Sequence, residues 1–157
     1  MVASPVSAPG LIVVPTAKNG PVLGLKPDAV GDVTANESAV LWRLNRNTPD
    51  VPSPLVSDGL VYLCRENGTL VLLDAKTGEQ IYEKRTHADR HRTSPVLADG
   101  KLYLSARDGT VSVVEPGREF KLLGQNKFKE PLAASPVAAN DTLYFRTYDA
   151  LYAVKSK

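Results

Sequence analysis

Two histidines and a carboxylate alternate in the segment RTHADRHR, residues 85–92, which contains His87, Asp89 and His91. From an extended loop this spacing could offer metal ligands, because imidazole and carboxylate groups both bind zinc. The segment falls on the connection between two predicted strands, however, and such connections usually carry solvated polar side chains. We therefore expect a solvated loop without a metal ion. A metal site and a polar contact surface are the alternatives.

The single cysteine, Cys64, is the other residue with reactive chemistry. It cannot form an internal disulfide, and it ends the apolar run LVYLC, where a small buried thiol is the ordinary arrangement. We expect an inert core thiol.

Three Asn-containing stretches, ENGT, NDT and NES, match the glycosylation acceptor pattern. The first two coincide with predicted hairpin turns, which Asn favours for conformational reasons. The stretch DGTVSVVEPG has carboxylates near glycine, but it lacks the alternating oxygen ligands of a calcium loop. We therefore predict no catalytic, cofactor-binding or metal-binding residues and no cofactor.

The composition is that of a folded protein, with 43% hydrophobic and 23% charged residues. A net charge of +2 gives no reason to expect nucleic acid or an anionic membrane surface as a partner. No apolar stretch approaches the roughly twenty residues of a membrane span, and no targeting signal is evident in these 157 residues.

An internal repeat organises the chain and must position any site. Ser-Pro pairs begin at positions 4, 53, 94 and 135, so the spacings are 49, 41 and 41 residues. We expect repeats at about 4–45, 53–86, 94–127 and 135–157 in a single domain. An insertion at roughly 26–38 accounts for the longer first spacing.

Each repeat alternates short apolar runs with Asp-Gly or Asn-Gly turn signals, which is typical of a meander of strands. In the second repeat the predicted strands are Leu55–Ser57, Leu60–Arg65, Thr69–Asp74 and Gln80–Lys84. The inner strands are apolar on both faces, which indicates sheets covered on both sides, whereas a sandwich would show apolar and polar alternation. Radially stacked four-stranded units are the blades of a β-propeller.

The predicted fold class is therefore all-β, a β-propeller segment of three complete four-stranded blades. The fourth repeat ends after its third strand, so we expect a fourth blade that lacks its outer strand. The turn glycines Gly59, Gly68, Gly100 and Gly109 are expected at positive φ. The tyrosines Tyr62, Tyr103 and Tyr144, which occupy one repeat position, are expected to pack between blades.

The stretch SPLVSDGLVYLCRENGTLVLLDAKTGEQIY, residues 53–82, resembles the repeat of the PQQ-like (quinoprotein-type) β-propellers. The resemblance extends over the chain and weakens in the first repeat, where Trp42 keeps the aromatic of the outer strand, and in the third. The stretch GDVTANESAVLWRLNRNTPDVPSPLV, residues 31–56, also resembles the C-terminal half of BamB-like outer-membrane assembly factor proteins.

The resemblance implies a non-enzymatic scaffolding propeller that binds unidentified protein partners in the periplasm or another extracytoplasmic compartment. The alternative is a non-catalytic half or remnant of a quinoprotein-type dehydrogenase. An active quinoprotein would need a closed ring, calcium ligands, a carboxylate base and adjacent cysteines. Cys64 stands alone, and four repeats supply about half of a ring.

Half a ring should expose an apolar blade face at each end of the arc, and such surfaces favour association. We therefore expect a homodimer in which the first blade of each chain packs on the fourth blade of the other. The two chains together would close a ring of eight blade-like units.

Overall fold

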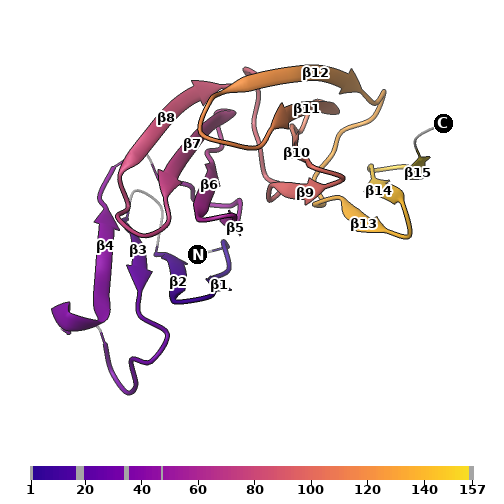
Figure 1. Ribbon diagram of the computed structural model, residues 1–157. Coiled ribbons are helices and arrows are strands. Elements are labelled where there is room, and N and C mark those ends of the chain that lie inside the picture. The colour runs from indigo at the N-terminus through magenta and orange to yellow at the C-terminus, as the bar shows by residue number, and fades with distance from the viewer. Residues whose placement is uncertain (1, 17–19, 34–35, 47, 156–157) are drawn as a thin grey trace.

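The computed structural model describes residues 2–16, 20–33, 36–46 and 48–155, which form fifteen strands and one single-turn 3-10 helix. Asn19 in the first repeat, and Ser156 and Lys157 at the end of the fourth, lie outside the described residues. The strands form four antiparallel sheets, three of four strands and one of three. Figure 1 shows the sheets following one another along an open arc. This is the predicted β-propeller segment.

The strands occur in each sheet in chain order. Sheet one contains β1 (Val6–Ala8), β2 (Leu11–Pro15), β3 (Val22–Leu25) and β4 (Val40–Leu44), with the 3-10 turn η1 (Glu37–Ala39) before β4. Sheet two contains β5 (Leu55–Ser57), β6 (Leu60–Cys64), β7 (Thr69–Asp74) and β8 (Gln80–Arg85). Sheet three contains β9 (Val96–Ala98), β10 (Lys101–Ser105), β11 (Thr110–Glu115) and β12 (Lys121–Lys127). Sheet four contains β13 (Val137–Ala139), β14 (Thr142–Arg146) and β15 (Leu151–Lys155).

The tight turns have the backbone that their sequences predict. Asp58 and Gly59 have φ angles of 50° and 72°, and Asp99 and Gly100 have 46° and 62°. Two successive positive φ angles match the twist of the flanking strands and are most accessible to Asp, Asn and Gly. The Asp-Gly pairs therefore fix the register of β5 with β6 and of β9 with β10.

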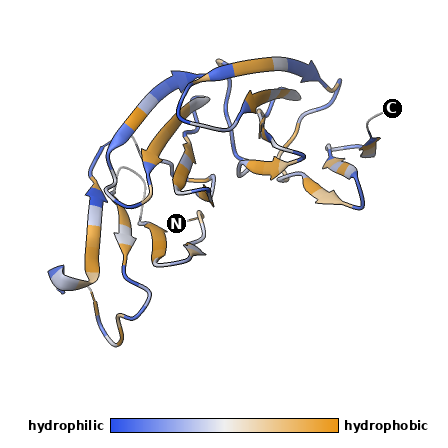
Figure 2. Cartoon of the chain, viewed as in Figure 1, coloured by the Kyte–Doolittle hydropathy of each residue, from blue (hydrophilic) through white to orange (hydrophobic). Residues whose placement is uncertain are grey.

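Apolar side chains on both faces of the inner strands join each sheet to its neighbours. Every residue of β6 is buried, and so are the first five residues of β7. Val61, Leu63, Val71 and Leu73 of sheet two pack against Leu11, Val13, Val22 and Trp42 of sheet one. The opposite face of sheet two packs against Leu102, Leu104 and Val114 of sheet three. Figure 2 shows the hydrophobic residues concentrated along these strands.

Trp42 of the outer strand β4 closes the boundary between sheets one and two. Its ring lies against Gly24 and Gly78, so closely that a Cβ atom at either glycine would overlap it. Its indole Nε1 donates a hydrogen bond of 2.8 Å to the carbonyl of Ala75. The outer-strand aromatic therefore anchors a blade to the turn of the following blade.

The predicted packing of the repeated tyrosine is right at two positions and wrong at the third. Tyr62 is 1% exposed, and Tyr103 packs against the cluster between sheets three and four. Tyr144 is 36% exposed, because no further sheet lies against its face of β14 among the described residues. The repeat sequence thus specifies the orientation of the side chain, whereas its burial depends on a neighbouring sheet.

Candidate functional site

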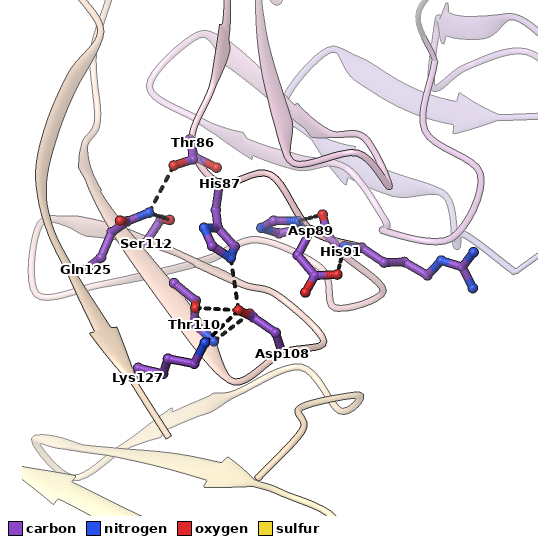
Figure 3. A network of polar contacts seen from close by, with 10 residues as sticks. Thr86, His87, Asp89, His91, Asp108, Thr110, Ser112, Gln125 and Lys127 are labelled. Carbon is purple, nitrogen blue, oxygen red and sulfur yellow. Dashed lines mark hydrogen bonds and ion pairs between the residues drawn. The ribbon is translucent and has the colours of Figure 1, made fainter. Parts of the chain in front are cut away.

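The polar segment predicted from the histidines lies between sheets two and three. It leaves β8 and crosses beside the turn that joins β10 to β11, where His87 Nε2 lies 3.1 Å from Asp108 Oδ2 (Figure 3). The same Oδ2 accepts bonds from Lys127 Nζ at 2.9 Å and from Thr110 Oγ1 at 3.0 Å. Two strands of sheet three, β11 and β12, and the connection from sheet two therefore supply donors to a single carboxylate.

These contacts determine the charge state of Asp108. Burial by itself would raise the pKa of its carboxyl, but hydrogen bonds from Lys127, Thr110 and His87 outweigh burial and hold the pKa well below its usual value of 3.8. A carboxylate with this many donors is a structural junction that fixes the turn before β11.

His91 corrects the expectation of a solvated loop, because it is 0% exposed. Its backbone N–H donates to the carbonyl of Glu66 at 2.8 Å, and its ring Nδ1 lies 2.9 Å from the carbonyl of Asp89. A carbonyl only accepts, so Nδ1 carries the proton and Nε2 is left as a bare acceptor. That Nε2 is buried without a hydrogen-bond partner in the described structure. Burial accordingly lowers the pKa of His91 below 6.5.

The repeat identifies the role of this buried imidazole. His91 forms an isolated bridge with Ala106, and 41 residues later Leu132 forms the same bridge with Thr147. Leu132 is also 0% exposed. Both side chains therefore fill the space beneath the connection between two sheets, and His91 fills it with a polar ring where the next repeat uses leucine.

A metal site at this place remains the alternative raised by the sequence. One ligating atom each from His87, Asp89 and Asp108 lies within 4.8 Å of the others. The sequence pattern indicated His87 and Asp89 but missed Asp108, which comes from the next repeat. The ammonium of Lys127 on Asp108 would repel a cation, and we retain the prediction that no metal binds.

The residues do not fit pyrroloquinoline quinone. The innermost strands β1, β5, β9 and β13 consist only of Val, Leu, Ala and Ser, so they offer no carboxylate or amide for calcium. Cys64 is 1% exposed inside sheet two, and burial raises the pKa of its thiol to about 12. The prediction of a buried core thiol is thus confirmed, and its raised pKa makes it unlike the reactive cysteines that a quinone site would use.

Three exposed arginines lie on loops between sheets two and three: Arg90 and Arg92 in the connection from β8 to β9, and Arg107 in the turn from β10 to β11. Elsewhere in the described ranges, Arg65 pairs with Glu83 and Arg118 pairs with Asp74. The exposed side chains of Arg90, Arg92 and Arg107 form none in that part of the chain. Arg90 and Arg107 are adjacent, since the N–H of Arg107 donates to the carbonyl of Arg90 at 2.7 Å. We call Arg90, Arg92 and Arg107 the arginine group.

Known proteins are similar to this chain in sequence and in fold. The model of the family described as outer membrane protein assembly factor BamB matches residues 27–119. A search of the curated proteins finds no match. No helix in the described ranges is long and apolar enough to cross a bilayer.

Solved structures share the fold at low sequence identity. BamB from Moraxella catarrhalis is 17% identical with a TM-score of 0.70, over 96% of this chain and 44% of that protein. The computationally designed Ika4 protein is 13% identical with a TM-score of 0.77, over 99% of this chain and 91% of the design. A europium-containing methanol dehydrogenase is 16% identical with a TM-score of 0.60, over 78% of this chain and 24% of the enzyme. The chain thus spans less than half the length of the Moraxella catarrhalis BamB and of the methanol dehydrogenase.

Proposed function

Because the chain belongs to the family of outer membrane protein assembly factor BamB, we propose that it is a non-catalytic propeller segment that binds other proteins outside the cytoplasmic membrane. The observation that carries this proposal is the family match over residues 27–119. The polar groups of the described structure are consistent with it, because the one converging cluster is a structural junction around Asp108 rather than a reactive site.

The arginine group is the surface that best suits a protein partner. Arginine is enriched in protein interfaces, because its planar guanidinium pairs with carboxylates and stacks on aromatic rings. The sheets beneath these loops are rigidly packed, and binding residues are often carried on loops held by such a scaffold. We propose that the partner presents acidic groups to the arginine group.

Site-specific photocrosslinking in envelope extracts tests this proposal. A photoreactive residue at Arg107 should label one defined envelope protein, and the same probe at Asp99, on the opposite end of sheet three, should not. Equal labelling from both positions, or no labelling from Arg107, would contradict the proposal. Arg107→Glu should abolish capture of the labelled partner while leaving the melting temperature unchanged.

The shared fold with a methanol dehydrogenase supports a second candidate, a non-catalytic half or remnant of a quinoprotein-type dehydrogenase. The composition of β1, β5, β9 and β13 argues against cofactor binding by the present segment. Incubation with pyrroloquinoline quinone and calcium, followed by desalting, separates the two candidates. Absorbance of the quinone that stays with the protein would favour the dehydrogenase candidate.

A further inference from the structure

The two ends of the arc carry faces that the same chain buries elsewhere. On sheet one the outward face carries Ile12, Val14, Leu23 and Leu25. By their place in the repeat they correspond to Val61, Leu63, Val71 and Leu73, which are fully buried against the preceding sheet. Sheet one therefore presents the surface that, one repeat later, receives a neighbouring blade.

The opposite end presents the matching surface. The outward face of sheet four includes Val137, Tyr144 and Leu151, and Leu151 is 66% exposed. Their counterparts in sheet two are Leu55, Tyr62 and Leu70, all of which pack in the cluster between sheets two and three. An outward face of sheet four against an outward face of sheet one would repeat the contact that already joins sheet two to sheet three.

A hydrogen-bonded series of serines supplies a second observation, independent of apolar surface. The backbone N–H of Ser4 donates to Ser53 Oγ, that of Ser53 to Ser94 Oγ, and that of Ser94 to Ser135 Oγ, each at 2.9 Å. Every sheet is thereby joined to the next through one donor and one acceptor. In the described ranges, the hydroxyl of Ser4 receives no such bond and the N–H of Ser135 gives none. The two ends of the arc thus carry a complementary donor and acceptor.

From this continuity we propose that a second copy of the chain covers both faces, with sheet four of each copy packed on sheet one of the other. The Ser135 N–H of one copy would then donate to the Ser4 hydroxyl of its partner, which extends the series across both contacts. Two copies related by a two-fold axis close a ring of eight sheets. This proposal rests on the repeat alone and does not depend on the proposed function.

Arg146 is the residue that should weaken the proposed contact between sheet four and sheet one. Arg146 takes the position of Cys64 and Ser105, which are 1% and 0% exposed in the interior of the arc. A guanidinium there opposes burial, because a charge that loses water without a partner is unfavourable. Arg146→Ser, which copies the third repeat, should therefore lower the dissociation constant of the dimer by about tenfold or more. Arg107→Ser, on a loop away from the two faces, is the matched control and should leave it unchanged.

Light scattering over a range of concentrations tests the assembly. The expected mass is about twice the 16.9 kDa of one chain. A mass of one chain at every concentration would overturn the proposal, and so would a mass that grows beyond two copies, because the ring would then not close.

Two charged variants test which faces meet. Val14→Glu on sheet one and Leu151→Glu on sheet four should each give single chains, with circular dichroism confirming that both remain folded. An equimolar mixture of the two should recover the two-chain mass, because it contains one intact pair of faces. A dimer that survives Leu151→Glu, or a mixture that stays as single chains, would overturn the head-to-tail arrangement.

Discussion

Sheets two and four have closely related sequences in different surroundings. In sheet two the strand LVYLC is buried along its whole length, whereas in sheet four the corresponding strand TLYFR has one buried residue, Phe145. The difference follows the number of neighbouring sheets, which is two for sheet two and one for sheet four among the described residues. A blade of this fold therefore has no hydrophobic core of its own, because each of its faces is buried only by packing against a neighbouring blade.

The largest expected difference between the two sheets is at the repeated tyrosine. Tyr62→Ala should lower the free energy of unfolding by about 3 to 5 kcal/mol, because it leaves a cavity between sheets and removes the acceptor of the Gly117 N–H. Tyr144→Ala should lower it by less than about 1 kcal/mol. Urea unfolding of both variants at a dilution that keeps single chains is the measurement. Equal losses would show that sheet four has a covered face of its own.

The turn glycines give the next largest contrast. Gly68 has φ of 80°, and a Cβ atom there would lie 1.8 Å from the carbonyl oxygen of His87, so Gly68→Ala should destabilise by about 3 kcal/mol. Gly100 has φ of 62° with no atom within 4 Å of such a Cβ, and Gly100→Ala should cost about 1 kcal/mol. Thermal melts that rank the two variants in the opposite order would contradict the packing of the connection against the turn.

The buried imidazole distinguishes the connection after sheet two from the one after sheet three. The pKa of His91 is lowered on folding. The contribution of the neutral imidazole to the free energy of unfolding is therefore fully present above pH 6.5 and is lost as the pH falls through the pKa of the folded state. His91→Leu, which copies Leu132, should remove this part of the loss of stability at low pH. At neutral pH it should raise the free energy of unfolding by about 1 kcal/mol, because it eliminates the unpaired Nε2.

Chemical unfolding of wild type and His91→Leu between pH 7 and 5 tests this contrast. Asp108 contributes its own acid loss below pH 3.8, outside that window, because its pKa is also lowered on folding. If the free energy of unfolding depended on pH in the same way in both proteins, the assignment of His91 as a buried, uncharged imidazole would be contradicted.

The smallest expected effect is that of metal. Zinc should leave the melting temperature unchanged, because Lys127 and Thr110 already occupy the oxygens of Asp108. His87→Ala serves as the control. A rise in melting temperature with zinc that this variant abolishes would instead establish a metal site.

The sequence predicted the strands well because turns and apolar runs are local signals. In the second repeat, Leu55–Ser57 and Thr69–Asp74 have their predicted bounds, and Leu60–Arg65 and Gln80–Lys84 each differ by one residue. Local signals do not report which face has a neighbour, and the exposure of Tyr144 was therefore mispredicted.

The same limit applies to the candidate site. His87 was found from its spacing, but its partner Asp108 lies one repeat away, and only the stacking of sheets brings them together. The burial of His91 could have been predicted by aligning it with Leu132, whose leucine marks an interior position of the repeat.

Hydrogen exchange measured sheet by sheet tests most directly the claim that each blade is completed by its neighbours. At dilutions that keep single chains, amides of β6 and β7 should exchange slowest, and amides of β14 and β15 should exchange faster by several orders of magnitude. Protection of β14 and β15 should rise with protein concentration as second copies cover them. Uniform protection of all four sheets in the single chain would contradict the account.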